Sequence, residues 1–337
     1  MRLRHLFWAV LLVLLVGWRS YIYFNDLSLY DIYAFAWPIA ITMVFGAFIC
    51  GATAEGGGAV AFPVMTLLLN ILPADARVFS LGCQSFGMTS ASVFILSQRI
   101  QVVKRCVLPV CAAGIIGFMV SDQWLVAIIP AKITKLFFVS LWLSFGFALW
   151  TINRKAGTIK NVDLPAQLGW KHILLLMVFG LFGGAISAIF GNGIDIITFT
   201  LLTLYFRIDE KIATPTSILL MTITTVFGFL WHILVRHDVS HAVQYYLLGA
   251  IPVCLSMAPM GAYVISKIPR KLIVNFLYIV LVVQFITAFW VIKPDLYHTG
   301  FSVAVVLIGL VAFSLLARNQ YPKKAAARKG SPTEISI

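Results

Sequence analysis

The chain has 337 residues, of which 61% are hydrophobic and only 11% are charged. A soluble domain carries roughly 25% charged residues, so this composition excludes a soluble enzyme or a soluble binding domain. The formal net charge is +13, but the basic residues are spread over short loops and the segment 318–337. That distribution is typical of a membrane protein, and it favours the lipid bilayer over nucleic acid as a partner.

Apolar runs of about 17–25 residues, the length of a transmembrane helix, recur from end to end. They predict an all-α polytopic membrane protein with a single transmembrane domain over 1–337. Two apolar regions, 33–72 and 172–206, are interrupted by glycines and are predicted to form helical hairpins. The single crossings are expected at 5–24, 78–98, 106–122, 131–151, 212–235, 243–266, 271–292 and 300–317.

Loop charges predict the orientation of these segments in the membrane. Basic residues concentrate before 5, in 99–105, in 154–171, in 267–271 and after 317. One threading places all of these clusters on the cytoplasmic side of a cell membrane, with both termini inside, as the positive-inside rule requires. In this threading the hairpin 33–72 enters from outside and the hairpin 172–206 enters from inside.

The two halves share a sequence signature. Gly56-Gly57-Gly58 corresponds to Gly191-Asn192-Gly193 at an offset of 135 (193 − 58), and Ala76–Ser80 corresponds to Ala213–Ser217 at 137 (213 − 76). We therefore expect two repeats, 33–151 and 172–292, of opposite orientation. Each repeat would be a glycine-broken hairpin followed by three crossings. The helices 5–24 and 300–317 and a cytoplasmic tail, 318–337, lie outside the repeats. Inverted repeats of this kind build secondary transporters, whose sites lie where the repeats meet.

The second limbs of the two hairpins are short. Ala59–Leu72 and Ile194–Phe206 would each cover about 20 Å, less than a hydrocarbon core of about 30 Å. We expect re-entrant hairpins whose tips converge from opposite faces of the membrane. If the hairpins instead cross fully, Glu55 lies in a cytoplasmic turn and Asp195 near the outer face, and both are ordinary solvated charges.

The re-entrant arrangement predicts a binding site at the two breaks. Each second limb would begin at the tip, so its unpaired N–H groups would face the centre and could bind an anion. Glycine also lets a ligand approach the backbone closely. Hydroxyl and amide side chains follow each hairpin and complete the candidate set: Gly56, Gly57, Gly58, Ser80, Gln84, Gly191, Asn192, Gly193, Thr216 and Ser217. The competing interpretation is that the glycines only permit close helix packing.

Glu55 and Asp195 are the ionisable residues at the two tips. An acid in a low-dielectric site favours its neutral form, so both are candidates for carrying a coupled proton. Their negative charge would otherwise repel an anion, and this conflict keeps a cationic substrate open. His232, Arg236 and Asp238 lie near the outer end of one crossing and are interpreted as interfacial anchors.

Enzyme motifs are missing from the sequence. It contains no HExxH, GxSxG or GxxxxGK[ST] pattern, and its five cysteines show no metal-ligand spacing. We therefore expect no catalytic residue, no metal and no cofactor. The sequence does not set the number of copies, so a homo-oligomer stays open.

The two glycine breaks, each followed by an Ala-x-x-Thr-Ser-like segment, resemble the sulfite exporter TauE/SafE family of membrane permeases. The similarity covers roughly 33–315 and rests on Glu55–Pro63 with Ala76–Ser80, and on Gly191–Gly193 with Ala213–Ser217. The resemblance implies export of sulfite, sulfoacetate or another organosulfonate across a prokaryotic cytoplasmic membrane. Alternatives are a cation or metal-ion permease that uses Glu55 and Asp195, and a membrane scaffold that transports nothing.

Overall fold

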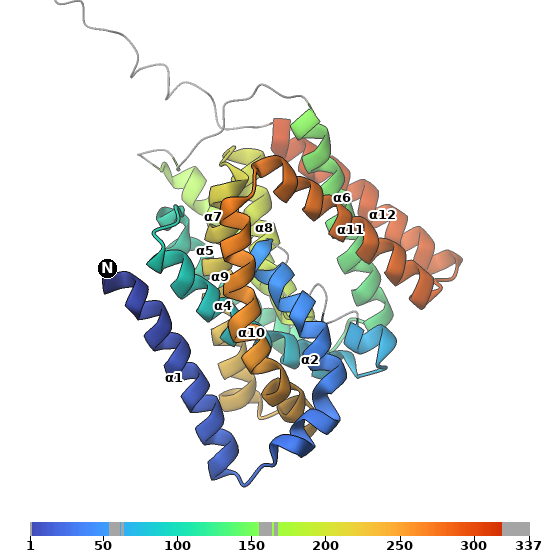
Figure 1. Ribbon diagram of the computed structural model, residues 1–337. Helices are drawn as coiled ribbons and strands as arrows, with labels where there is room; N and C mark the ends of the chain where they lie inside the picture. Colours follow the sequence, from blue (N-terminus) through green and yellow to red (C-terminus); the bar gives the residue numbers. More distant parts are fainter. Residues whose placement is uncertain (1, 54–60, 62–63, 155–163, 165–167, 319–337) are drawn as a thin grey trace, which may run out of the picture.

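The computed structural model describes residues 2–53, 61, 64–154, 164 and 168–318. Every regular element in these ranges is helical, as predicted (Figure 1). The longer helices are α1 (Arg2–Phe24), α2 (Leu29–Ala52), α4 (Pro73–Ser97), α5 (Val107–Val120), α6 (Ala131–Arg154), α7 (Trp170–Phe190), α9 (Glu210–Trp231), α10 (His241–Lys267), α11 (Arg270–Ile292) and α12 (Leu296–Arg318). Shorter helical elements are η1 (Val64–Leu68), η2 (Lys104–Cys106), η3 (Ser121–Leu125), α8 (Ile194–Thr200), η4 (Leu201–Tyr205) and η5 (His232–Arg236).

Within the described residues, eight helices are long and apolar enough to cross a membrane. They include α2 and α7, so the first limb of each predicted hairpin has the length of a full crossing. The eight spans are His5–Phe24, Leu29–Ala52, Pro73–Ser97, Lys104–Leu125, Trp170–Phe190, Glu210–Arg236, His241–Lys267 and Leu296–Leu316. The predicted crossings 131–151 and 271–292 also form helices, α6 and α11.

The second hairpin breaks where the glycines predicted it. Helix α7 ends at Phe190, and the chain resumes as α8 at Ile194. The helical segment Ile194–Tyr205 is only 12 residues long, about 18 Å, and is too short to cross a hydrocarbon core of about 30 Å. The first break lies outside the described residues, and with it lie Glu55, Gly56, Gly57 and Gly58.

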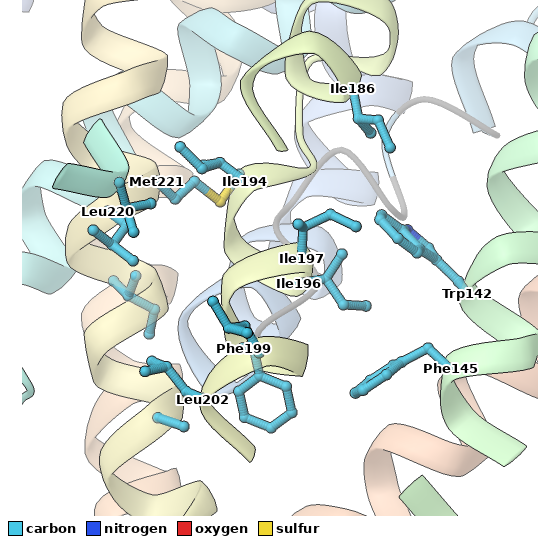
Figure 2. Close-up of a cluster of buried hydrophobic side chains, with 14 of the residues drawn as sticks. Trp142, Phe145, Ile186, Ile194, Ile196, Ile197, Phe199, Leu202, Leu220 and Met221 are labelled. Atoms are coloured by element: carbon cyan, nitrogen blue, oxygen red, sulfur yellow. The ribbon is translucent and has the colours of Figure 1, made fainter. Parts of the chain in front are cut away.

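Helix α8 is enclosed by protein, since every residue from Ile194 to Thr200 is buried. Backbone that lies at membrane depth without belonging to a full transmembrane helix has to be buried in protein or line a watery cavity. Helix α8 meets the first condition. Figure 2 shows its apolar neighbours between α9 and α6, a cluster whose labelled members are Trp142, Phe145, Ile186, Ile194, Ile196, Ile197, Phe199, Leu202, Leu220 and Met221.

The second limbs of the two hairpins end in the same local geometry, 137 residues apart. Each contains a five-residue π-helical turn, Val64–Leu68 in the first half and Leu201–Tyr205 in the second (201 − 64). Each turn is followed by a non-glycine residue in the left-handed region, Asn70 at φ 54° and Arg207 at φ 55°. A left-handed non-glycine residue is uncommon, so its recurrence at one offset is informative.

The hydrogen bonds that close these turns recur at the same offset. The Ile71 N–H donates to the Met65 carbonyl at 2.8 Å, and the Ile208 N–H donates to the Leu202 carbonyl at 2.8 Å. Helices α4 and α9 then begin 137 residues apart, at Pro73 and Glu210 (210 − 73). The segments from Val64 to Pro73 and from Leu201 to Glu210 therefore share these backbone features although their side chains differ.

Two helix pairs pack closely, and each pair takes one helix from the first half of the chain and one from the second. Helix α10 packs along α2, and α5 packs along α7. Small residues permit the contact, because a Cβ at Gly51 would overlap the Ala258 carbonyl and a Cβ at Gly184 would overlap the Gly114 carbonyl. Backbones that approach this closely are typical of membrane helix pairs with glycine at the interface. The glycines at these positions therefore serve packing.

Helices α4 and α9 cross at the centre of the molecule. The Ser85 hydroxyl donates to the Thr225 carbonyl at 2.9 Å, and the hydroxyls of Ser92 and Thr222 lie 2.7 Å apart. Helices α6, α11 and α12 form a group on one flank, and α1 lies on the opposite flank (Figure 1). The centre is thus built from helices α2, α4, α5 and α7 to α10, with the remaining long helices around it.

Replacing Gly184 by Ala should lower stability by about 1–3 kcal/mol, because the added methyl group has to displace the backbone of α5. Thermal unfolding of the purified protein in detergent measures the change. Gly17→Ala is the matched control, since nothing lies within 4 Å of a Cβ at Gly17. Equal melting temperatures for the two variants would contradict the close α5–α7 contact.

Candidate functional site

The break between α7 and α8 depends on two glycines with positive φ. Gly191 adopts φ +81°, and its N–H donates to the Ser187 carbonyl at 2.8 Å, which ends α7. Gly193 adopts φ +158°. A Cβ at Gly191 would lie 2.8 Å from the Ser80 Cβ and 2.9 Å from the Arg77 carbonyl oxygen. The break is therefore seated directly against helix α4, and glycine is required for that contact.

The amides of this break already have partners. The Gly193 N–H donates to Asp195 Oδ1 at 3.0 Å, and the Ile194 N–H donates to Ser187 Oγ at 3.0 Å. The expectation of free amides at the start of this limb was wrong for these two groups. Buried backbone groups require partners, and here side chains two and seven residues away supply them. An anion at this position would have to displace Asp195.

Gln84 connects the break to the first half of the chain. Its Nε2 donates to the Gly191 carbonyl at 2.9 Å and to the Ser80 carbonyl at 3.0 Å. Ser80 and Gln84 are 1% and 2% exposed. Residues 107 apart in sequence thus meet at the glycine turn, and the structure brings together three residues of the predicted set: Ser80, Gln84 and Gly191.

Two polar atoms at the break are buried without a hydrogen-bond partner among the described residues: Asp195 Oδ2 and Gln84 Oε1. Asp195 is 1% exposed, and Asn192 beside it is equally buried. Leaving a buried polar atom unsatisfied costs about 1–3 kcal/mol, so such atoms often mark a site that binds a ligand or a proton. Both atoms belong to residues that the sequence placed in the site.

The hydroxyls of Thr216 and Ser217 form hydrogen bonds away from the Gly191 break. The Thr216 hydroxyl donates to the Ile212 carbonyl at 2.6 Å and accepts the Val103 N–H at 2.9 Å. The Ser217 hydroxyl donates to the Thr214 carbonyl at 2.8 Å. These bonds hold the start of α9 and its neighbouring connection, and the binding role of both residues stays a prediction. The remaining residues of the predicted set, Gly56, Gly57 and Gly58, lie outside the described residues.

A buried cluster of charges lies where α4 begins and α9 ends, and it is centred on Asp122 in η3. The Trp231 Nε1–H donates to Asp122 Oδ2 at 3.0 Å, and Arg236 Nε lies 3.5 Å from the same oxygen. Arg77 Nη2 and His232 Nε2 each lie 3.8 Å from Asp122 Oδ1. Asp122 is 2% exposed and Arg77 is 5% exposed, so this is an ion-pair network inside the protein.

Sequence reasoning missed this cluster. It interpreted His232 as an interfacial anchor, which is wrong because His232 is fully buried and bonds Asp238 Oδ1 through Nδ1 at 2.8 Å. The available signal was the ionisable residues at the ends of predicted crossings, Arg77 and Asp122, since such residues are expensive in a membrane and require partners. The pairing of Arg77 with Asp122 could not be predicted, because the two residues are far apart in the sequence.

The chain matches a known family model over residues 39–289, about three quarters of its length, and the model is that of the sulfite exporter TauE/SafE. The chain belongs to the sulfite exporter TauE/SafE family. Members of this family are membrane transporters of sulfur-containing anions and not enzymes, and this TauE/SafE protein is a multi-pass membrane transporter of that class. No curated protein and no solved structure matches the chain.

The matched region has a structural meaning. It begins within α2 and ends within α11, so it contains the glycine break, α4, α9 and the buried charge cluster. Helices α1 and α12, which the sequence placed outside the repeats, also lie outside the match.

Replacing Gln84 by Ala should destabilise the protein by about 1–3 kcal/mol, because the buried Gly191 carbonyl loses its donor. The melting temperature in detergent measures this effect. Gln244→Ala is the control, since its amide donates to the Tyr21 hydroxyl in an exposed hydrogen bond. A Gln84→Ala protein as stable as the control would show that the bond between the two halves contributes nothing.

Proposed function

We propose that this protein is a secondary transporter that exports a small sulfur-containing oxyanion, such as sulfite, sulfoacetate or another organosulfonate. Its family supports the substrate class. The hydrogen bond from Gln84 to the Gly191 carbonyl supports a site between the two halves, since it joins α4 of the first half to the break of the second. A site between two halves is the arrangement that alternating access uses.

The proposal includes two inverted repeats, 33–151 and 172–292, in one transport domain. The matched π-helical turns, the left-handed residues Asn70 and Arg207 and the exchanged packing of α2 with α10 and α5 with α7 support a repeated unit. Loop charge supports opposite orientations, with both termini in the cytoplasm. Re-entrant second limbs are supported by the 12-residue length of Ile194–Tyr205.

The proposed binding residues lie at the two breaks. They are Ser80 and Gln84 on α4 with Gly191, Asn192 and Gly193 and, by the repeat, Thr216 and Ser217 on α9 with Gly56, Gly57 and Gly58. Support comes from the Gly191 side, where the hydroxyl of Ser80 and the unpartnered Gln84 Oε1 are buried beside the turn. A ligand at the first break would meet the corresponding groups of the other half.

Asp195 suits a proton carrier because its carboxylate holds the Gly193 amide. When Asp195 takes up a proton, it loses the charge that repels an anion and weakens its hold on that amide. The anion then gains a donor at the same step. Glu55 is the proposed carrier of the first half, because it is the ionisable residue next to the first glycine cluster. Binding of proton and oxyanion would thus be coupled through one backbone group.

Purified wild-type protein in proteoliposomes should catalyse saturable flux of sulfite or sulfoacetate. The release of labelled anion from sulfate-free vesicles measures this flux, and protein-free vesicles loaded with the same anion measure the leak. The flux should accelerate when the proton gradient favours symport. Flux of divalent cations without oxyanions would establish instead the permease that uses Glu55 and Asp195, and flux of neither would leave a non-transporting scaffold.

Neutralising the proposed proton carriers should remove the pH dependence of transport. Asp195→Asn and Glu55→Gln should each weaken the dependence of the transport rate on pH, because each variant removes one of the two proposed carriers. Asp209→Asn is the control, because Asp209 caps α9 at the surface and asparagine caps equally well. A pH profile unchanged from that of the wild type would exclude the substituted residue as the carrier.

A further inference from the structure

Arg77 lies on the same face of α4 as the proposed binding residues. Arg77, Ser80 and Gln84 are spaced i, i+3 and i+7, which places them on one stripe of the helix. The Arg77 carbonyl oxygen lies 2.9 Å from the position of a Cβ on Gly191, so the stripe begins directly beside the break. Helical side chains lean toward the N-terminus, and the guanidinium therefore lies one turn beyond Ser80, toward Asp122.

The Arg77 side chain is poorly compensated for a buried charge. It is 5% exposed, and its Nε has no hydrogen-bond partner within the described residues. The contact from Arg77 Nη2 to Asp122 Oδ1 measures 3.8 Å, whereas a charge-assisted hydrogen bond measures about 2.7–2.9 Å. A buried cation needs close anionic oxygens, and Asp122 supplies them only at a distance.

Asp122 depends less on Arg77 than Arg77 depends on Asp122. The Asp122 carboxylate also receives the Trp231 N–H at 3.0 Å and has Arg236 at 3.5 Å, both closer than Arg77. If the guanidinium turned away, Asp122 would remain paired. Arg77 is thus free to exchange one oxyanion for another without leaving a buried carboxylate alone.

We propose that Arg77 binds the oxyanion group of the transported substrate, and that Asp122 holds the guanidinium when the substrate is absent. This inference rests on the proposed anion transport. A guanidinium presents a planar fork of N–H donors that matches two oxygens of a sulfite or sulfonate group. With Ser80 one turn along, it supplies the positive charge that the break itself does not contain. Substrate and Asp122 compete for one cation.

Saturable anion flux of Arg77 and Asp122 variants tests this competition. Arg77→Gln should raise KM about 10- to 100-fold, the range expected for losing one charged hydrogen-bonding partner. Arg77→Lys should give an intermediate KM, because it keeps the charge and loses the fork. Asp122→Asn should lower KM severalfold, because the competing carboxylate is gone. A purely structural ion pair predicts no fall in KM for any variant.

The matched control is Arg236→Gln, which removes the other arginine from the same carboxylate. It should lower the melting temperature and raise KM much less than Arg77→Gln does, because it leaves the proposed substrate-binding guanidinium in place. If Arg77→Gln fails to fold, Arg77→Lys and Asp122→Asn decide the question by the direction of their KM changes. An Arg77→Gln protein with wild-type KM, or an Asp122→Asn protein whose KM does not fall, overturns the role of Arg77 alone. Wild-type protein that moves no oxyanion overturns the transport function and this inference together.

Discussion

The structure depends on supplying hydrogen-bond partners to the backbone of a helix that is broken inside a membrane. A turn such as Gly191-Asn192-Gly193 exposes backbone groups that lipid cannot bond, so protein has to supply every partner. Here Ser187 and Asp195 take the amides, and Gln84 reaches across from α4 to take the Gly191 carbonyl. The stability of the turn and its position between the halves therefore have the same cause.

That constraint also explains the chemistry available at the turn. The groups that stabilise the break are polar and buried, which gives them well-defined geometry and a low-dielectric setting. They are also the groups to which we propose that the substrate binds, and on that proposal binding and folding compete for them. Asp195 shows this most clearly, because its one bonded oxygen holds backbone while its second oxygen has no partner among the described residues.

Much of the fold could be predicted because hydrophobic length and glycine placement act locally. The crossings and the break at Gly191 follow from patterns within a few tens of residues, and the offset of 137 follows from comparing two short motifs. The partners at the site did not follow so easily. Gln84 was predicted in the site, but its bond to Gly191 spans 107 residues, and the Arg77–Asp122 contact joins helix ends that share no pattern. Pairings of this kind depend on how the helices stack.

The occupied amides of Gly193 and Ile194 could not be read from the sequence for a related reason. Composition shows that a helix starts after the glycines, but not whether a nearby side chain folds back onto its N–H groups. Ser187 and Asp195 both do so. The conflict between glycines that favour an anion and an acid that opposes it takes a concrete form, because Asp195 accepts the Gly193 N–H, one of the donors of the proposed anion site.

The exchanged packing of α2 with α10 and of α5 with α7 sets which parts can move together. Each interlocked pair takes one helix from each half, so neither half can travel as a unit without separating backbones in van der Waals contact. Groups of helices that keep these contacts take members from both halves: α2 and α4 with α10, and α7 and α9 with α5. The chain passes between these groups after α4 and again after α9, at the left-handed residues Arg99 and His237. Those two connections are where the chain joins the two groups of helices.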